Sequence, residues 1–313
     1  MSELMIEADR VSKRFGSVTA LDEVSVQVPR GSVLGLLGHN GAGKTTLVNV
    51  LTTMLPPSGG QARVAGLDVV KQAGQVRARI GLTGQFAAVD EQISGLDNLI
   101  LIARLLGASK REARQRGTDL LEMFGLAEAG KRPARTYSGG MRRRLDLAAS
   151  LVGRPDVIFL DEPTTGLDPE SRLGMWQIVE GLVGDGTTVL LTTQYLDEAD
   201  RLADSITVLA AGKVVASGTA AELKAQVGQR TVVVTLAKQA EAETGIAALK
   251  RAGLQPVQDE IRHAVTIPVT RSAELAVVVR ALDEVGVEVD ELALTEPTLD
   301  DVYLTLARTP AAA

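Results

Sequence analysis

The chain has 313 residues, contains no cysteine and carries a formal charge of -6. This length suits about two domains, and the lack of cysteine excludes disulfides, thiolate metal ligands and cysteine nucleophiles. Because basic and acidic residues are interspersed and the net charge is negative, we expect no nucleic acid as a partner.

No stretch of the sequence is apolar for long enough to predict a membrane span. The longest apolar runs, such as VLGLL and VIFL, are about a quarter of the roughly 20 residues that cross a bilayer. The first residues carry acids and lack the basic and apolar blocks of a secretion signal. We therefore expect a cytoplasmic protein that contacts a membrane only through a partner.

Residues 1–227 alternate short β-branched runs with longer helical patterns. This alternation is typical of a mostly parallel sheet covered by helices, an α/β architecture that often holds a nucleotide. The runs, most of them bounded by Gly or Pro, are 24–31, 33–38, 157–163 and 188–194.

Helical signals replace the strand signals between about residues 94 and 153. Ser94 and Ser109 stand where helix N-caps belong, and Glu112 completes a capping box with Ser109. Gly125 follows a helical pattern and is expected to end it. We predict that this stretch is a helical subdomain inserted into the sheet domain.

Residues 228–313 predict a second, smaller α+β domain. The patterns give a β-α-β-β-α-β order, which suggests a ferredoxin-like domain. The expected elements are strand 230–237, helix 242–253, strands 255–258 and 263–269, helix 272–286, strand 287–294 and a last helix from Thr298.

A glycine-rich loop, GLLGHNGAGKTT, lies between a predicted strand and a predicted helix. Gly38, Gly41 and Gly43 allow backbone amides to surround the β and γ phosphates of a nucleotide, and the helix N-terminus adds partial positive charge. Lys44 supplies a point charge, and Thr45 can hold Mg²⁺. A plain Gly-rich turn is the alternative, and the strand-loop-helix context argues against it.

A second strand, within DVIFLDEPTTGLD, ends in two adjacent carboxylates. Asp161 suits an outer-shell partner of Mg²⁺, and Glu162 suits a base that polarises water against the γ phosphate. Acidic residues at strand ends are also common as solvated loop residues. The phosphate loop favours the catalytic interpretation.

With these two motifs, three further stretches resemble the ATP-binding subunits of ABC transporters, over about Leu4 to Leu223. YSGGMRRR (137–144) resembles the signature sequence of that family, TGQF (83–86) its glutamine loop, and TGLD (165–168) its D-loop. The resemblance implies a P-loop NTPase of the ABC ATPase type, with a mixed sheet core and a helical subdomain. Together the motifs argue against any other class of P-loop NTPase.

The motifs and the resemblance together give the candidate site. We expect catalytic roles for Lys44, Gln85, Glu162 and Gln194, and Mg²⁺ near Thr45, Gln85 and Asp161. The residues expected at ATP are Phe15, Gly38, His39, Asn40, Gly41, Ala42, Gly43, Lys44, Thr45, Thr46, Ser138, Gly139, Gly140 and Asp168.

Two candidates carry explicit alternatives. Phe15 stands where the family places an aromatic residue for adenine stacking, and a buried core phenylalanine is the alternative. Gln194 stands where most of the family has a histidine that contacts the γ phosphate. An amide can donate a hydrogen bond to an anionic oxygen but cannot shuttle a proton, so we expect a sensor and positioner. The alternative is a solvated spectator.

Three consecutive arginines, Arg142 to Arg144, follow the signature glycines in the first turn of a predicted helix. Positive charge there opposes the helix dipole, so we expect these side chains to face carboxylates or phosphates. A basic solvated face is the alternative, and the dipole rule does not decide between the two.

The C-terminal stretch TEPTLDDVYLTLAR narrows the resemblance to ATPases of the daunorubicin-resistance type, which power ABC-2 exporters of drugs and lipids. Tyr303 matches the aromatic position of their closing motif. TYSGGMRRRLDLAASL and TTQYLDEAD also resemble this subgroup. The alternative is one apolar helix face made by Leu299, Val302, Tyr303 and Leu306.

The resemblance implies an ATPase that uses ATP and Mg²⁺ and drives export through a separate ABC-2 type permease at the cytoplasmic face of the membrane, without touching the transported substrate. In the family each ATP lies between the phosphate loop of one subunit and the signature of the other, and this chain has one of each. We therefore expect a head-to-tail homodimer. The alternatives to a transport ATPase are a soluble ABC ATPase acting on ribosomes or DNA, and a nucleotide-gated binding protein.

Overall fold

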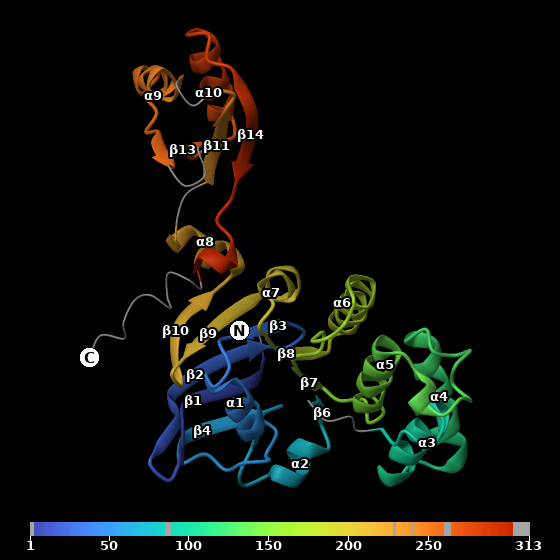
Figure 1. The fold of residues 1–313 in the computed structure, drawn as a ribbon. Helices are drawn as coiled ribbons and strands as arrows, with labels where there is room; N and C mark the ends of the chain where they lie inside the picture. Colours follow the sequence, from blue (N-terminus) through green and yellow to red (C-terminus); the bar gives the residue numbers. More distant parts are fainter. Residues whose placement is uncertain (1–2, 85–88, 228–229, 239–240, 260–263, 303–313) are drawn as a thin grey trace. The chain divides into compact units, whose positions relative to one another are not determined.

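The computed structural model describes residues 3–84, 89–227, 230–238, 241–259 and 264–302. They belong to two compact units, Met1–Ala220 and Ala221–Ala313, each with its own apolar core (Figure 1). The first unit contains two sheets and a group of helices, and the second contains one sheet with helices. Among the described residues, no helix is both long and apolar enough to cross a membrane.

The central sheet of the first unit has six strands in the order β10-β9-β3-β8-β7-β6. Neighbours are parallel except for β9 and β10, so the sheet is mixed as expected. Every residue of β3, β7 and β8 is buried, which explains their continuous apolar sequences. The strands are β3 (Val33–Leu37), β6 (Ile80–Thr83), β7 (Val157–Asp161), β8 (Thr188–Thr193), β9 (Ser205–Ala210) and β10 (Lys213–Gly218).

A separate antiparallel sheet flanks this one, in the order β2-β1-β4-β5. The run 24–31 lies here and not in the mostly parallel sheet, so that part of the expectation was wrong. Its alternating burial, with Val24, Val26 and Val28 buried, is the pattern of a strand with one buried face. The strands are β1 (Leu4–Phe15), β2 (Val18–Pro29), β4 (Gly59–Val64) and β5 (Leu67–Asp68).

Helix α1 (Lys44–Leu51) connects the two sheets. It packs against β1, β2 and β4 and against β7, and its buried Leu47 and Val48 belong to the core that both sheets share. This packing fixes the start of α1, and with it the glycine-rich loop, relative to the central sheet. The short helix α2 (Ala73–Arg77) precedes β6.

Helices fill the chain between β6 and β7 and lie to one side of the first unit (Figure 1). Ser94 and Ser109 cap their helices as predicted, and Ser109 forms a complete capping box with Glu112. Gly125 takes a φ of 65° just after the second helix, which confirms it as the terminator. The helices are α3 (Gly95–Leu105), α4 (Lys110–Met123), the 3₁₀ turn η1 (Ala134–Thr136) and α5 (Gly139–Ser150).

Two more helices complete the first unit. Helix α6 (Pro169–Gly184) begins with Asp168 as its N-cap and a proline in its first turn, and α7 (Leu196–Leu202) follows β8 directly. The buried residues of α6, including Met175 and Val179, pack in the same core as the helices between β6 and β7.

The second unit has the predicted β-α-β-β-α-β order, and its antiparallel sheet runs β12-β13-β11-β14. This order is that of a ferredoxin-like domain, so the expected fold class is confirmed. Leu299 and Val302 are buried after the Thr298 cap, whereas Tyr303 and Leu306 lie outside the described residues. The elements are α8 (Ala220–Val227), β11 (Arg230–Leu236), α9 (Ala242–Arg251), β12 (Val257–Asp259), β13 (Ala264–Val269), α10 (Glu274–Asp283) and β14 (Val289–Thr295).

Candidate active site

Three neighbouring strands end at the same edge of the central sheet. Strand β8 lies between β3 and β7, and all three are parallel, with Leu37 opposite Thr193 and Asp161 opposite Thr192. The carboxyl ends of these parallel strands therefore form one edge of the sheet, which is called the carboxyl edge here. The segments that follow the strands there contain the glycine-rich loop, Gln194 and Glu162. Open α/β sheets bind ligands at this edge. Strand β6 ends beside β7 and leads toward Gln85, which lies outside the described residues.

The glycine-rich loop curls around the side chain of Lys44. This lysine is buried, and its Nζ donates to the carbonyl oxygens of Gly38 at 2.7 Å and His39 at 3.3 Å. Burial lowers the pKa of Lys44, and the charges of Glu162 and Asp161 partly offset this. The ammonium is thus held inside the loop, where an anion would replace carbonyl oxygens as its partner.

The loop backbone leaves the first turn of α1 open to an anion. Gly43 precedes α1 with a φ of 110°, and none of the described side chains caps this helix. A Cβ at Gly43 would lie 2.7 Å from the carbonyl oxygen of Ala20, so only glycine fits. The loop and helix therefore have the geometry of a phosphate cradle, formed by Gly38, His39, Asn40, Gly41, Ala42, Gly43, Lys44, Thr45 and Thr46.

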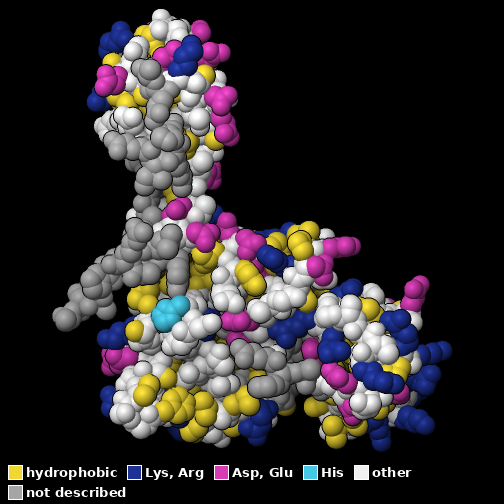
Figure 2. All heavy atoms as spheres, in the orientation of Figure 1, with side chains coloured by type: hydrophobic (Ala, Val, Ile, Leu, Met, Phe, Trp, Pro, Cys, Tyr) yellow, Lys and Arg dark blue, Asp and Glu magenta, His cyan; other side chains and the backbone are white. Residues whose placement is uncertain are grey.

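His39 and Asn40 form the outer part of this loop. His39 is exposed and is the cyan side chain in Figure 2. Its Nδ1 lies 2.7 Å from the carbonyl oxygen of Asn40. The ring therefore lies at the surface of the loop and not in a buried network.

Asp161 lies between two hydroxyl groups. The Thr192 hydroxyl donates to its Oδ1 at 2.5 Å, and the Thr45 hydroxyl lies 3.5 Å from its Oδ2. Among the described residues, no three His, Asp or Glu side chains gather as a metal site. A single carboxylate with a hydroxyl fits Mg²⁺ bound mainly through substrate phosphates and water, because Mg²⁺ is usually held by one or two carboxylates in such sites.

Glu162 occupies a strained backbone position directly after β7. Its φ is 49°, in the left-handed region, which costs a non-glycine residue on the order of 1–2 kcal/mol. Its N–H donates to both the carbonyl and the hydroxyl oxygen of Thr192, each at 3.1 Å. Its half-buried carboxylate accepts from Thr165 at 3.3 Å and lines a cavity of about 410 Å³ together with Gly139.

The signature residues begin helix α5. Ser138 is its N-cap and accepts from the N–H of Met141 at 3.2 Å. A Cβ at Gly140 would lie 2.5 Å from the Ser171 hydroxyl oxygen, so the start of α5 touches the start of α6. There, Asp168 accepts from the N–H of Ser171 at 3.0 Å and caps α6.

The three arginines after the signature glycines have different partners. Arg142 forms an ion pair with Glu91 at 2.7 Å, as expected for a group facing a carboxylate. Among the described residues, Arg144 donates to the carbonyl oxygen of Phe124 at 3.3 Å, and Arg143 donates to backbone carbonyls alone. Arg143 nevertheless lies near the carboxylates of Asp146, Asp161, Glu198 and Glu162, so the expectation holds for Arg142 and Arg143, whereas Arg144 bonds a carbonyl oxygen instead.

Two candidate contacts to the nucleotide are exposed. Phe15 ends β1 with 47% of its surface exposed, so it is not a core residue, and the Nζ of Lys13 lies 5.2 Å from its ring centre. Gln194 follows β8 and is also exposed, and its side chain forms no hydrogen bond to another described residue. Both side chains are accessible to a ligand.

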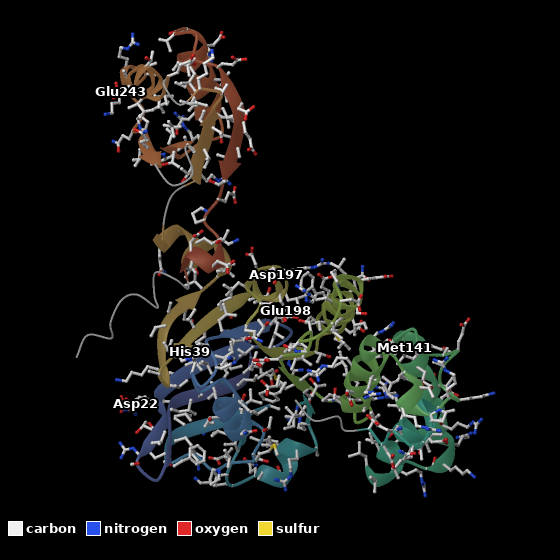
Figure 3. All side chains as sticks on the ribbon, viewed as in Figure 1. Asp22, His39, Met141, Asp197, Glu198 and Glu243 are labelled. Carbon is white, nitrogen blue, oxygen red and sulfur yellow. The ribbon has the colours of Figure 1, made fainter. Side chains whose placement is uncertain are left out.

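Within one chain, the phosphate loop and the signature turn do not face one another across a common nucleotide site. Figure 3 shows His39, in the loop, and Met141, in the first turn of α5, far apart in the view. Both belong to the first unit. The structure therefore brings together the loop, Asp161, Glu162 and Gln194 at one edge, and leaves Ser138, Gly139 and Gly140 away from the loop.

Sequence reasoning missed three residues that organise this edge. Thr192 and Arg143 contact the segment 161–163. In the sequence, Thr192 is only a threonine at the end of an apolar strand, and Arg143 is one of three arginines whose partners the sequence does not decide. Glu198 on α7 is buried and accepts from the Thr164 hydroxyl at 2.9 Å and the Trp176 indole at 3.0 Å (Figure 3). The sequence did not single out Glu198 because it lies in an ordinary amphipathic helix.

Comparisons with known proteins match this geometry. Residues 21–165 match the ABC transporter family model, and residues 218–307 match the C-terminal domain of ATP-binding proteins of the DrrA1-3 type. A daunorubicin resistance ATP-binding protein of Streptomyces coeruleorubidus is 52% identical over 98% of this chain and 96% of its own length. The chain belongs to this family of ABC transporter ATP-binding proteins.

Two further ABC proteins are similar over the first unit. A Nod factor export ATP-binding protein of Ralstonia nicotianae is 40% identical over 70% of this chain and 68% of its own length. A dimeric ATP-binding cassette, solved in a post-hydrolysis state with ADP and Pi, has a TM-score of 0.63 and covers 69% of this chain and 98% of its own. At 24% identity this cassette shows the fold alone. As an ABC transporter ATP-binding protein, the chain binds ATP and hydrolyses it in coupling with transport.

Proposed function

We propose that this ATPase energises the efflux of a drug, an antibiotic or an amphipathic lipid through a separate ABC-2 type permease. The observation that carries the proposal is similarity to a daunorubicin resistance protein along nearly the whole chain, including the C-terminal domain. The Nod factor export protein adds a relative that is named for export. The chain would act at the cytoplasmic face of the membrane, bound to the permease, and would not touch the transported molecule.

The site residues would have different roles in ATP hydrolysis. The loop 38–46 and Lys44 would bind the phosphates of ATP, and Phe15 would stack on adenine. Thr45 and Asp161 would hold Mg²⁺ with the phosphates, where the ion neutralises charge on the triphosphate. Gln85 would join them from its loop, which stays a prediction because that residue lies outside the described part of the chain.

Glu162 would take a proton from the attacking water, and Gln194 would donate a hydrogen bond to the γ phosphate. Both side chains leave the same sheet edge as the phosphate loop. The carboxylate of Glu162 faces an open cavity and is bonded only by Thr165 among the described residues, which leaves room for a water molecule. An amide at position 194 positions an anionic oxygen without changing its protonation.

Two copies would assemble head to tail and close two ATP sites. The separation of the loop from Ser138, Gly139 and Gly140 within one chain supports this, because a second copy would supply the missing signature turn. Asp168 caps α6 beside that turn and would contribute to the same interface. The similarity to a dimeric cassette fold agrees with such an arrangement.

The assembly is tested by sizing the Glu162→Gln variant with MgATP. This variant should bind ATP without consuming it, so we expect a stable dimer in MgATP and a monomer in EDTA. The matched control is Glu162→Gln combined with Lys44→Ala, which should stay monomeric because it loses the phosphate contact. A monomer of Glu162→Gln at all protein and nucleotide concentrations contradicts the head-to-tail dimer.

Export is tested in a drug-sensitive bacterial host that expresses the chain together with a candidate ABC-2 permease. Wild-type protein should lower the accumulation of daunorubicin or of an amphipathic lipid probe, and Glu162→Gln should not. Co-purification of the permease checks the partnership independently. If the chain binds ribosomes or DNA instead and no permease co-purifies, the soluble ABC ATPase becomes the better proposal.

A further inference from the structure

Glu162 is held in its left-handed conformation by bonds on both sides of the residue. Its N–H is fixed by Thr192 of β8, through the carbonyl and the hydroxyl oxygen. Its carbonyl oxygen accepts from Nη2 of Arg143 on α5 at 2.9 Å. The backbone conformation of a residue sets the direction of its Cα–Cβ bond. The groups that hold the Glu162 backbone therefore also set the direction of its carboxylate.

Arg143 bonds the whole segment around Glu162. Four of its N–H groups are used, and every acceptor is a backbone carbonyl oxygen. Nε donates to Pro163 at 2.8 Å, Nη1 to Gly84 at 3.0 Å, and Nη2 to Asp161 at 3.0 Å and Glu162 at 2.9 Å. The planar guanidinium thus fixes three consecutive peptide groups and the residue that precedes Gln85.

We propose that Arg143 is a positioning residue that holds the peptide segment 161–163 so that Glu162 is aimed at the attacking water. The inference rests on the proposed role of Glu162 as the base. Arg143 itself touches neither the carboxylate of Glu162 nor the phosphate loop through any hydrogen bond of the described residues. It acts through the backbone, and it links the helix that begins with the signature turn to the strand end that carries the base.

A lysine cannot replace this arrangement. Its ammonium is a compact point charge with three donors, whereas the four carbonyls here surround a rigid, planar fork. Burial lowers the pKa of the Arg143 guanidinium, and the nearby carboxylates of Asp146, Asp161, Glu198 and Glu162 offset this. Arg116 on α4 also donates to a backbone carbonyl, that of Leu151 at 2.6 Å, but it bonds no residue of the segment 161–163 among the described residues and provides a matched control.

The first experiment measures steady-state hydrolysis by Arg143→Gln, Arg143→Lys and the control Arg116→Gln. For Arg143→Gln we expect kcat to fall on the order of tenfold to a hundredfold, because a small displacement of a catalytic group costs about that much. The KM for ATP and the Kd of a fluorescent ATP analogue should stay within about threefold, because the phosphate loop is unchanged. Arg143→Lys should lose kcat in the same way, and Arg116→Gln should match wild type.

Two results would overturn the proposal. One is a wild-type kcat in either Arg143 variant. The other is a parallel loss of kcat, ATP affinity and thermal stability in Arg143→Lys, which indicates a general packing role. Arg143→Lys keeps the charge and most of the side-chain volume, so the question remains answerable if Arg143→Gln does not fold.

The second experiment combines Arg143→Gln with Glu162→Gln and measures single-turnover hydrolysis. If Arg143 acts through Glu162, its loss costs nothing further once the base is gone, so the double variant should match Glu162→Gln within about threefold. A further tenfold loss in the double variant overturns the inference. Failure of the base role is seen separately, because Glu162→Gln alone would then hydrolyse ATP at the wild-type rate.

Discussion

The hydroxyl of Thr192 donates a hydrogen bond to the carboxylate of Asp161, 2.5 Å away, across the neighbouring strands β8 and β7. The same hydroxyl oxygen accepts from the N–H of Glu162. One buried threonine therefore connects both carboxylate-bearing residues at the end of β7 to the strand that carries Gln194.

Replacing Thr192 with valine should destabilise the protein. The change keeps the shape of the side chain but leaves the buried Oδ1 of Asp161 without this donor, which costs about 1–3 kcal/mol. Urea unfolding should show this decrease in the free energy of unfolding, together with a lower ATPase kcat. Thr192→Ser keeps the hydroxyl and should stay close to wild type. Equal stability of the valine and wild-type proteins contradicts the prediction.

The Gln194→Ala variant should hydrolyse ATP at least about tenfold more slowly than wild type. A hydrogen bond to a charged acceptor contributes about 1.5–3 kcal/mol, and each 1.4 kcal/mol is a factor of ten. Gln194→His should be tolerated, because a ring N–H can donate in the same place. Steady-state kcat measures both effects, and full activity of the alanine variant would show that Gln194 is a spectator.

Glu198 should make stability fall as pH rises. Burial raises the pKa of this carboxyl, and hydrogen bonds from Thr193, Trp176 and Thr164 offset only part of the effect. The folded state holds the proton to higher pH than the unfolded chain, so its contribution is fully present below the unfolded pKa and is lost as pH rises through the folded pKa. Glu198→Gln removes this ionisation and should flatten the dependence.

The measurement for Glu198 is urea unfolding at several values between about pH 4 and pH 8. At neutral pH the Glu198→Gln variant should be at least as stable as wild type. Glu243 is an exposed residue of the second unit and offers the control, and Glu243→Gln should leave the pH dependence of the free energy of unfolding unchanged. If the free energy of unfolding depends on pH in the same way in wild type and Glu198→Gln, Glu198 is not the cause of that dependence.

Phe15→Ala should weaken ATP binding without destabilising the fold. Stacking of a base on an aromatic ring contributes roughly 1–3 kcal/mol, which corresponds to about a fivefold to a hundredfold rise in Kd. Stability should change little because the ring is 47% exposed. Val18→Ala alters the same hairpin at a residue that is 63% exposed and serves as the control. An unchanged Kd for ATP in Phe15→Ala excludes the stacking role.

The parts of the site that sequence predicted are those whose chemistry is local. The phosphate loop, the helix caps at Ser94 and Ser109 and the carboxylates at the end of β7 each depend on residues a few positions apart, so their spacing shows in the sequence. The antiparallel sheet was missed because β1 and β4 pair across a long stretch of chain. The partners of Arg143 could not be found because they are backbone carbonyls from two segments far apart in the sequence, which have no side-chain signature.

The position of β8 between β3 and β7 also has a consequence for the newly made chain. The phosphate loop is synthesised early, but the strand that pairs with β3 and separates it from β7 ends only at Thr193. The central sheet cannot close around the loop until the ribosome has passed that residue, because this long-range pairing is non-local. The loop can therefore take its final place between these strands only after β8 has been synthesised.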